Sequence, residues 1–183
     1  MDRRQRKTRK AIFDSFIQLL SKKSFENITV SEILDTADVG RATFYSHFET
    51  KDYLLKELCR ELFCHIFDAL HSENSHNHIF NCNSKENVFL HLLRHLQKND
   101  NHILDLLTGS NNELFSRYFT VELKALVKDN FHIFENEKYK LIPLDFRINQ
   151  ITASFMETVK WWYNNKMSES AETVADYFFI SVS

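Results

Sequence analysis

Apolar residues recur at intervals of three and four along most of this chain, which is the spacing that lines one face of an α-helix. The first series predicts a helix that begins near Thr8 and ends at 22–24. Thr29 and Glu32 then form a capping box, because each side chain can bond the backbone N–H of the other residue. A second, short helix is therefore predicted to begin at Val30.

A tight break and two more helices follow. Residues 38–40 read Asp-Val-Gly and interrupt the pattern, since Asp tolerates left-handed backbone geometry and Gly serves as an N-cap. A short helix is predicted over 41–48. Thr50 is then expected to cap a long helix over about 51–70, whose apolar positions repeat without a break.

The rest of the chain is predicted to be helical apart from polar breaks. Residues 71–83 lack a helical period and are predicted to form a loop. Pro143 fits the first turn of a helix that continues to about Asn164. Further helices are expected over 84–97, 102–108, 114–131 and 170–181, with breaks at 98–101, 109–111 and 164–168. The chain is therefore predicted to be all-α.

Composition supports helices and narrows the function. The 183 residues are 43% apolar, enough for one domain or two small ones, but include two Gly and one Pro. Two Gly are too few for a fold rich in β-hairpins or for a Gly-rich phosphate loop. No apolar run reaches the roughly 18–20 residues of a membrane span. Three cysteines without a signal-peptide pattern ahead of them, Cys59, Cys64 and Cys82, fit a reducing cytosol. We therefore expect a soluble, cytoplasmic protein, with no cofactor indicated.

The two parts of the chain differ in charge. Residues 1–60 hold 12 Lys and Arg against 9 Asp and Glu, whereas residues 61–183 hold 11 against 16. Six of the first ten residues are basic. They are predicted to form a flexible basic arm that leads into the first helix, and arms of this kind commonly contact phosphate. The N-terminal region is therefore a candidate for binding a polyanion.

Two short helices separated by a tight turn, just after a basic helix, predict a helix-turn-helix, whose second helix usually enters the major groove of DNA. Its second helix is rich in side chains that can bond phosphates or base edges, more than a buried helix would carry. They are Arg41, Thr43, Tyr45, Ser46 and His47, with Lys51 at the start of the following helix.

This region resembles the TetR family of bacterial transcriptional regulators. The family pattern reads approximately T-V-x-x-I, then A-G-V-S-x-x-T-F-Y-x-H-F, then K-x-x-L. This chain has Thr-Val-Ser-Glu-Ile at 29–33, Ala-Asp-Val-Gly-Arg-Ala-Thr-Phe-Tyr-Ser-His-Phe at 37–48 and Lys-Asp-Tyr-Leu at 51–54. The resemblance covers residues 8–60, and a weaker one lies at Trp-Trp-Tyr, 161–163.

The resemblance implies which residues contact DNA. Four positions match family positions that hold the DNA backbone: Thr29, Tyr45, His47 and Lys51. Arg41 and Ala42 match the first exposed positions of the recognition helix. Arg41 is expected to read guanine, because its guanidinium fits O6 and N7 with about 1–3 kcal/mol of discrimination. The complete predicted set is Thr29, Ser31, Arg41, Ala42, Thr43, Tyr45, Ser46, His47 and Lys51.

Two residues of the turn depart from the family pattern. Asp38 stands where the family usually has Gly, and Gly40 where it often has Ser. Asp accepts left-handed geometry and Gly is an acceptable N-cap, so the turn is expected to survive at a cost of some tenths of a kcal/mol. Asp38 also places a negative charge near the predicted DNA side.

The resemblance divides the chain into a DNA-binding domain, 1–60, and a helical regulatory and dimerisation domain, 61–183. It implies a homodimer formed through the last two helices, a palindromic double-stranded DNA operator and a small-molecule effector. Repression is the commoner outcome in the family, and activation or co-activation through the C-terminal domain is the alternative. A bundle lined by aromatic residues could enclose the effector, and the candidates are Phe89, Leu93, Phe115, Phe119 and Phe155.

Other functions have less support in the sequence. There is no nucleophile elbow, Walker loop, HExxH motif or supported carboxylate pair, so an enzyme is not predicted. An adaptor that keeps the helix-turn-helix without using it is a further alternative. His91 and His95 are four residues apart on one helix face and could share zinc, but a structural site needs four ligands. Solvated or hydrogen-bonded histidines are the simpler interpretation, so no metal site is predicted.

Overall fold

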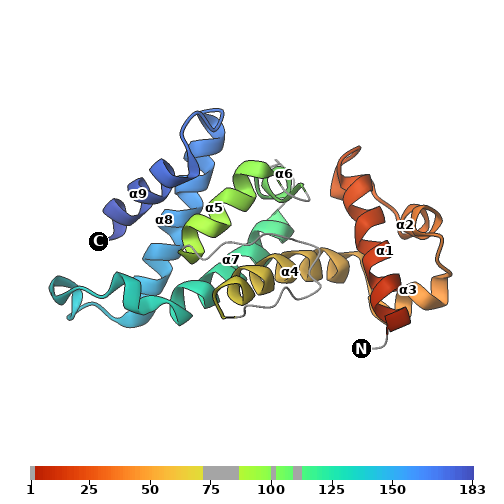
Figure 1. Cartoon of the computed structure of the whole chain (residues 1–183), viewed down its shortest axis with the longest axis horizontal. Helices are drawn as coiled ribbons and strands as arrows, with labels where there is room; N and C mark the ends of the chain where they lie inside the picture. Colours follow the sequence, from red (N-terminus) through yellow and green to blue (C-terminus); the bar gives the residue numbers. More distant parts are fainter. Residues whose placement is uncertain (1–2, 72–86, 100–101, 109–112) are drawn as a thin grey trace.

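The computed structural model describes residues 3–71, 87–99, 102–108 and 113–183, with side chains described throughout except at 67–71. Every regular element in these ranges is a helix, as the sequence predicts. Two groups of helices lie side by side, with the N-terminal group at the right of Figure 1 and the C-terminal group at the left. The helix α4 runs from one group into the other.

The N-terminal group contains three α-helices and a 3-10 turn. They are α1 (Arg3–Leu20), η1 (Phe25–Asn27), α2 (Val30–Ala37) and α3 (Arg41–His47). Helix α1 packs along α2, and aromatic side chains of α1 and α3 meet between them. The Phe13 and Phe48 rings lie edge to face at 5.4 Å. This small core holds α3 against the domain while leaving its other face open.

The N-terminus corrects one expectation. Helix α1 begins at Arg3, so the residues predicted to form a flexible basic arm are helical from that point. Arg, Gln and Lys are good helix formers, and no Gly or Pro interrupts them. Arg9 also anchors this segment, because its guanidinium bonds Glu57 at 2.8 Å and Glu61 at 3.1 Å on α4.

Helix α4 (Lys51–His71) begins where the sequence places it. The Thr50 hydroxyl accepts a hydrogen bond from the backbone N–H of Tyr53 at 3.0 Å, which confirms the predicted N-cap. Its buried face includes Leu54, Leu58 and Leu62. The predicted boundary between domains at residue 60 falls inside this continuous helix.

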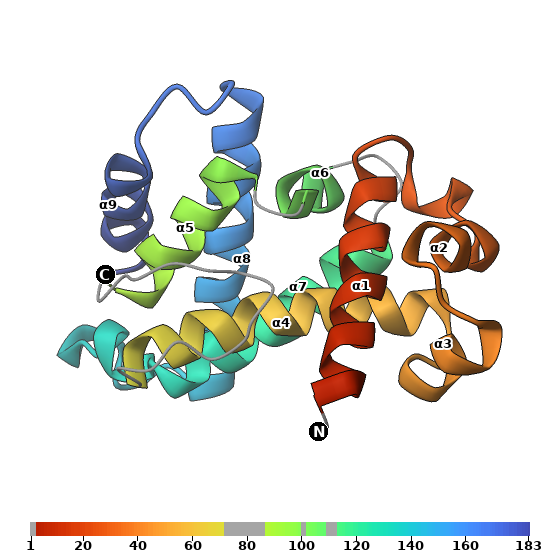
Figure 2. The ribbon, with the colours of Figure 1, turned by 45° about the vertical axis from the view of Figure 1, so that its right-hand side comes forward.

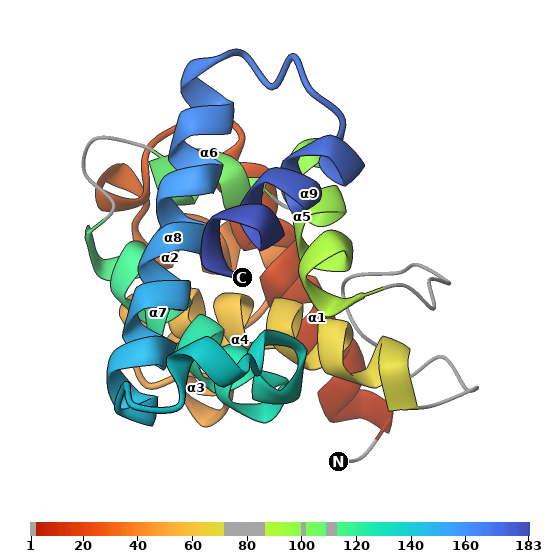
Figure 3. The same ribbon diagram turned by 90° about the vertical axis from the view of Figure 1, so that its left-hand side faces the viewer.

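The C-terminal group packs against the second half of α4. Its elements are α5 (Val88–Lys98), α6 (Ile103–Thr108), α7 (Glu113–Asp129), η3 (Phe131–Phe134), η4 (Glu137–Tyr139), α8 (Leu144–Asn164) and α9 (Ala171–Val182). Helix α4 contacts α7 and α5, while α8 packs on α7 and α9 packs on both α8 and α5. Figure 2 shows α5 beside α9 with α8 behind it, and Figure 3, seen from the side of α8 and α9, shows α5 beside α9 and above the end of α4.

Several helix ends differ slightly from the prediction. Helix α5 is capped by Asn87, whose side chain accepts from the N–H of Phe89, while the predicted start at Ser84 and the loop over 71–83 lie almost wholly outside the described residues. Helix α7 ends at Asp129, and the aromatic residues that follow it form a 3-10 turn. Within this turn Phe134 is buried and Phe131 partly buried, whereas Ile133 is exposed. The predicted helix end at about Phe131 is therefore two residues too late.

Candidate nucleic-acid interface

The entry to α2 is a reciprocal capping box, as predicted. The Thr29 hydroxyl accepts from the backbone N–H of Glu32 at 3.3 Å, and the Glu32 carboxylate accepts from the N–H of Thr29 at 2.8 Å. Lys23 forms an ion pair with the same carboxylate. Hydrogen bonds from Lys23 and Thr29 lower the pKa of Glu32 to about 2, so this carboxyl is charged at any ordinary pH.

The turn between α2 and α3 survives both departures from the family pattern. Asp38 takes the left-handed conformation at φ 52° and ends α2, which is the place that Gly usually fills. Gly40 is the N-cap of α3 with φ −70°, a conformation open to any residue. A Cβ at Gly40 would meet its nearest neighbour, the Thr43 hydroxyl, at 3.9 Å. The strained position is therefore Asp38 alone.

Replacing Asp38 with Gly should stabilise the domain by about 0.5–1 kcal/mol, because Gly adopts left-handed geometry without a steric penalty. The same change removes a negative charge near the predicted DNA side, so affinity for DNA should rise at low salt. Urea unfolding and DNA titration of Asp38→Gly would measure the two effects. Asp38→Asn is the matched control, since it removes the charge but keeps a side chain in the left-handed position.

Helix α3 presents one polar face to solvent and buries the other. Phe44 and Phe48 are fully buried, and the ring of Tyr45 packs edge to face on Phe44 at 5.4 Å while remaining half exposed. Ser46 donates its hydroxyl proton to the Thr43 carbonyl at 2.7 Å. The exposed residues of the predicted set on this helix are Arg41, Ala42, Thr43, Tyr45 and Ser46. Ser31 on α2 is exposed as well.

His47 lies at the end of α3 and is half-buried. Burial lowers its pKa below 6.5, and the nearby Arg9 cation lowers it further. The imidazole is therefore neutral near pH 7 and can accept or donate a single hydrogen bond at the edge of the exposed face.

Lys51 has an internal role that the sequence did not indicate. Its ammonium donates to the carbonyls of Phe25 at 2.8 Å, Ile28 at 2.7 Å and Glu26 at 3.4 Å, and lies 4.3 Å from the centre of the Phe25 ring. Partial burial lowers its pKa. An ammonium has three N–H donors, so these carbonyls use all of them. Contact between Lys51 and a DNA phosphate stays a prediction, and it would require one of these bonds to break.

The predicted effector-contacting residues lie in the core. Phe89, Leu93, Phe115, Phe119 and Phe155 are all fully buried. Phe89 and Phe155 belong to a cluster of rings completed by Phe134, Phe178 and Phe179, whereas Phe119 packs on Phe63 at 5.0 Å. Phe89 and Phe155 therefore lie in one group of packed rings and Phe119 in another. Contact of the five residues with an effector stays a prediction.

A hollow of about 450 Å³ lies nearby, between η3, η4 and the start of α8. Phe134 joins it to the ring cluster, packing on Phe89 at 5.2 Å. The buried Arg147 forms part of its wall, with a guanidinium 3.9 Å from the Tyr139 ring and a hydrogen bond to the Val182 carbonyl at 2.9 Å. Sequence patterning did not single out Arg147, because one Arg within an amphipathic helix normally faces solvent.

Comparison with known proteins matches both parts of the chain to families. Residues 12–58 match the family described as bacterial regulatory proteins, tetR family, and residues 83–183 match a transcriptional regulator C-terminal region. The crystal structure of a TetR transcriptional regulator from Streptococcus agalactiae 2603V is similar over 100% of this chain and 97% of that chain. The TM-score is 0.76 and the sequence identity 34%.

Two curated relatives are also similar. YxbF of Bacillus subtilis, an uncharacterised HTH-type transcriptional regulator, is 35% identical over 78 residues, which are 42% of this chain and 20% of that protein. The chain thus spans about a fifth of the length of YxbF. DhaS of Lactococcus lactis, an activator of the dhaKLM operon, is 28% identical over 149 residues, which are 81% of this chain and 71% of that protein. None of the described helices has the length and apolar character needed to cross a membrane.

Proposed function

Because this chain belongs to the TetR family of bacterial transcriptional regulators, we propose that it binds a palindromic operator as a homodimer and represses transcription until an effector lowers its affinity. The family membership makes it a DNA-binding regulator of transcription with an N-terminal helix-turn-helix. Members of the family are generally not enzymes, and no catalytic role is proposed here. We expect the protein to act in the cytoplasm, on the DNA that carries its operator.

The outward face of α3 carries this proposal. Arg41, Thr43, Tyr45 and Ser46 are exposed on one side of the helix, while Phe44 on the other side is fully buried. The buried face holds α3 in place against the N-terminal core, so its exposed polar face is free to enter the major groove of DNA. Arg41 stands at the N-terminal end of the helix, where recognition helices usually contact base edges.

The homodimer is supported by the exposed face of α8 and α9. Trp161 of α8 packs edge to face on Tyr177 of α9 at 6.0 Å, yet both rings are nearly half exposed. Ile180 is 77% exposed one turn further along α9. Large apolar side chains gathered on one helix pair are typical of surfaces that bind a partner. We propose that a second copy covers them by two-fold symmetry.

Arg41 and Tyr45 provide the test of DNA binding. In fluorescence anisotropy with duplexes tiled across the upstream region of its own gene, the protein should bind one tile saturably and more weakly as salt rises. Arg41→Ala should weaken binding to that tile by about 1–3 kcal/mol more than it weakens binding to a scrambled tile. Tyr45→Phe should weaken binding through a lost phosphate contact, with less effect on sequence preference.

Lys56→Ala is the matched control, since Lys56 is an exposed cation on α4 outside the predicted set. Equal, salt-insensitive binding to every tile by all variants would contradict the proposal for that region and favour the adaptor alternative. Because DhaS is named as an activator, the test must also distinguish activation from repression. The measurement is transcription of the gene downstream of the bound tile, with and without the protein. Increased transcript on deletion of the gene supports repression, and decreased transcript supports activation.

A further inference from the structure

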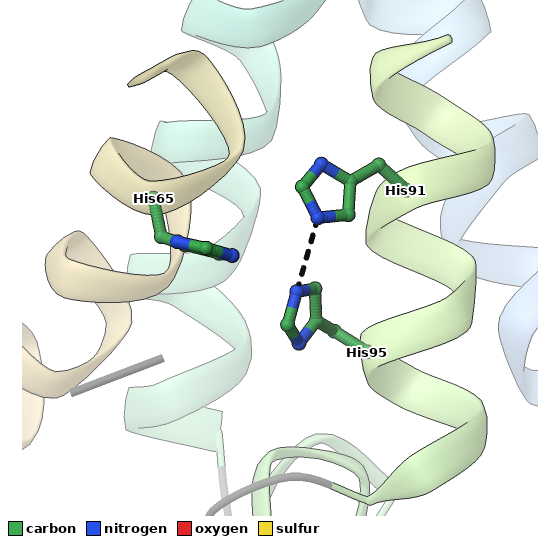
Figure 4. Close-up of side chains that lie close together, drawn as sticks. All are labelled: His65, His91 and His95. Atoms are coloured by element: carbon green, nitrogen blue, oxygen red, sulfur yellow. Dashed lines mark hydrogen bonds between the residues drawn. The ribbon is translucent and has the colours of Figure 1, made fainter. Parts of the chain in front are cut away.

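Three buried histidines meet where α4 crosses α5. His65 comes from α4, and His91 and His95 come from successive turns of α5. Their exposed fractions are 5%, 2% and 3%. Figure 4 shows the rings of His91 and His95 one above the other along α5, with the ring of His65 approaching from the opposite side. The sequence indicated the pair on α5, and the fold adds the third imidazole.

The nitrogen atoms of this cluster are close enough to share one ion. The Nε2 atoms of His91 and His95 form a hydrogen bond of 3.1 Å, which a bound ion would replace. One ring nitrogen from each of the three histidines lies within 4.8 Å of the others. Zn–N bonds of about 2.0–2.1 Å at tetrahedral angles place ligand nitrogens roughly 3.3–3.4 Å apart. The α5 pair is already near that spacing, and His65 must move by about 1.5 Å at most to reach it.

Buried apolar side chains lie next to the three histidines along α4 and α5. Leu62 and Ile66 of α4 and Leu92 and Leu96 of α5, each within one turn of one of these histidines, are fully buried. Three nitrogen ligands from two helices resemble the three-ligand zinc sites that keep one open position.

We propose that His65, His91 and His95 bind a divalent transition-metal ion, with zinc as the best fit. Imidazole nitrogen suits Zn²⁺, Co²⁺, Ni²⁺ and Cu²⁺, whereas Mg²⁺ and Ca²⁺ require oxygen ligands. Zinc accepts a tetrahedral site without a preference imposed by its d electrons. The three imidazoles would supply three ligands, and water or a small anion would complete the fourth.

The site is placed to influence the rest of the protein. A bound ion would cross-link the second half of α4 to α5, and the first turn of α4 holds the loop before α2 through Lys51. An effect of metal on operator affinity rests on the proposed function. Metal binding itself does not, because it is measured on the protein without DNA.

The test is a Co²⁺ titration of the full chain, purified without a histidine tag and freed of metal by chelation. We expect one equivalent per chain with the intense visible absorption of a tetrahedral ion, displaced by Zn²⁺. His65→Gln and His91→Gln should each weaken binding by about 100-fold or more, since loss of an outer partner alone costs 10–100-fold. His132→Gln, at an exposed histidine on η3, should bind like the unaltered protein.

A second measurement guards against variants that fail to fold. Saturating Zn²⁺ should raise the melting temperature of the unaltered protein by about 5 °C or more at 100 times its Kd, and should leave that of His91→Gln unchanged. Unaltered protein that takes up no Co²⁺, or shows the weak absorption of an octahedral surface ion, overturns the proposal however the variants behave. Stoichiometric binding retained by both His65→Gln and His91→Gln overturns it as well.

Discussion

Ile180→Glu should convert the proposed homodimer to a monomer and lower its affinity for the operator by about 100-fold or more. A carboxylate at the centre of an apolar interface would have to be buried without a partner, which costs several kcal/mol. A monomer contacts one half-site, so it loses the gain in effective concentration that two linked recognition helices provide. Light scattering after size-exclusion chromatography would report the mass, and anisotropy the affinity.

Leu141→Glu is the matched control for this prediction. Leu141 is an apolar residue that is 98% exposed and lies in the segment before α8, outside the proposed interface. The control protein should remain dimeric and bind the operator normally. Trp161→Glu should behave like Ile180→Glu, because Trp161 lies on the same exposed face. Dimers that persist in both interface variants would place the contact elsewhere on the surface.

Lys51→Met should lower the free energy of unfolding by about 2–3 kcal/mol. The substitution keeps most of the apolar stem but removes the ammonium that bonds the carbonyls of Phe25 and Ile28. Hydrogen bonds to a charged group contribute about 1.5–3 kcal/mol, and the carbonyls left behind lose a partner at a partly buried position. Urea unfolding followed by circular dichroism would measure the change.

Lys56→Met separates this structural effect from a general loss of charge. Lys56 lies one turn further along α4 and is exposed, so its replacement should alter stability by less than about 0.5 kcal/mol. If Lys51→Met were as stable as Lys56→Met and yet failed to bind DNA, the ammonium would act on phosphate rather than on the loop. That result would contradict the role that its three carbonyl partners indicate.

Most of the fold follows from local patterns in the sequence. Thr29 and Thr50 begin their helices as the predicted N-caps, because capping depends on residues three positions apart. Ser170, predicted as the first residue of the last helix, is its N-cap. Asp38 adopts the left-handed conformation expected of it. The expectation of a flexible arm was wrong: local helix formers extend α1 to Arg3, and Arg9 holds it to Glu57 and Glu61, 48 and 52 residues away along the chain.

The functional details that the sequence missed share the same cause. The partners of Lys51 are backbone carbonyls, which leave no mark on the side-chain sequence. His65 joins His91 and His95 through the packing of α4 on α5, and no spacing along the chain predicts that contact. The exposed face of α3 was predictable because one helix carries it. Sites assembled from separate helices require the tertiary structure.

The continuity of α4 has a mechanical consequence. At a rise of 1.5 Å per residue, about 21 Å of unbroken helix separates Lys51 from His65. A small rotation of α4 at one end therefore displaces its other end. A rotation of about 5° at the histidine end would displace the other end by roughly 2 Å. In a two-fold dimer the displacements of the two α4 helices would add to roughly 4 Å, more than the 3.4 Å between successive base pairs. A small shift of the C-terminal group of helices would then misalign the two α3 helices with an operator of fixed spacing.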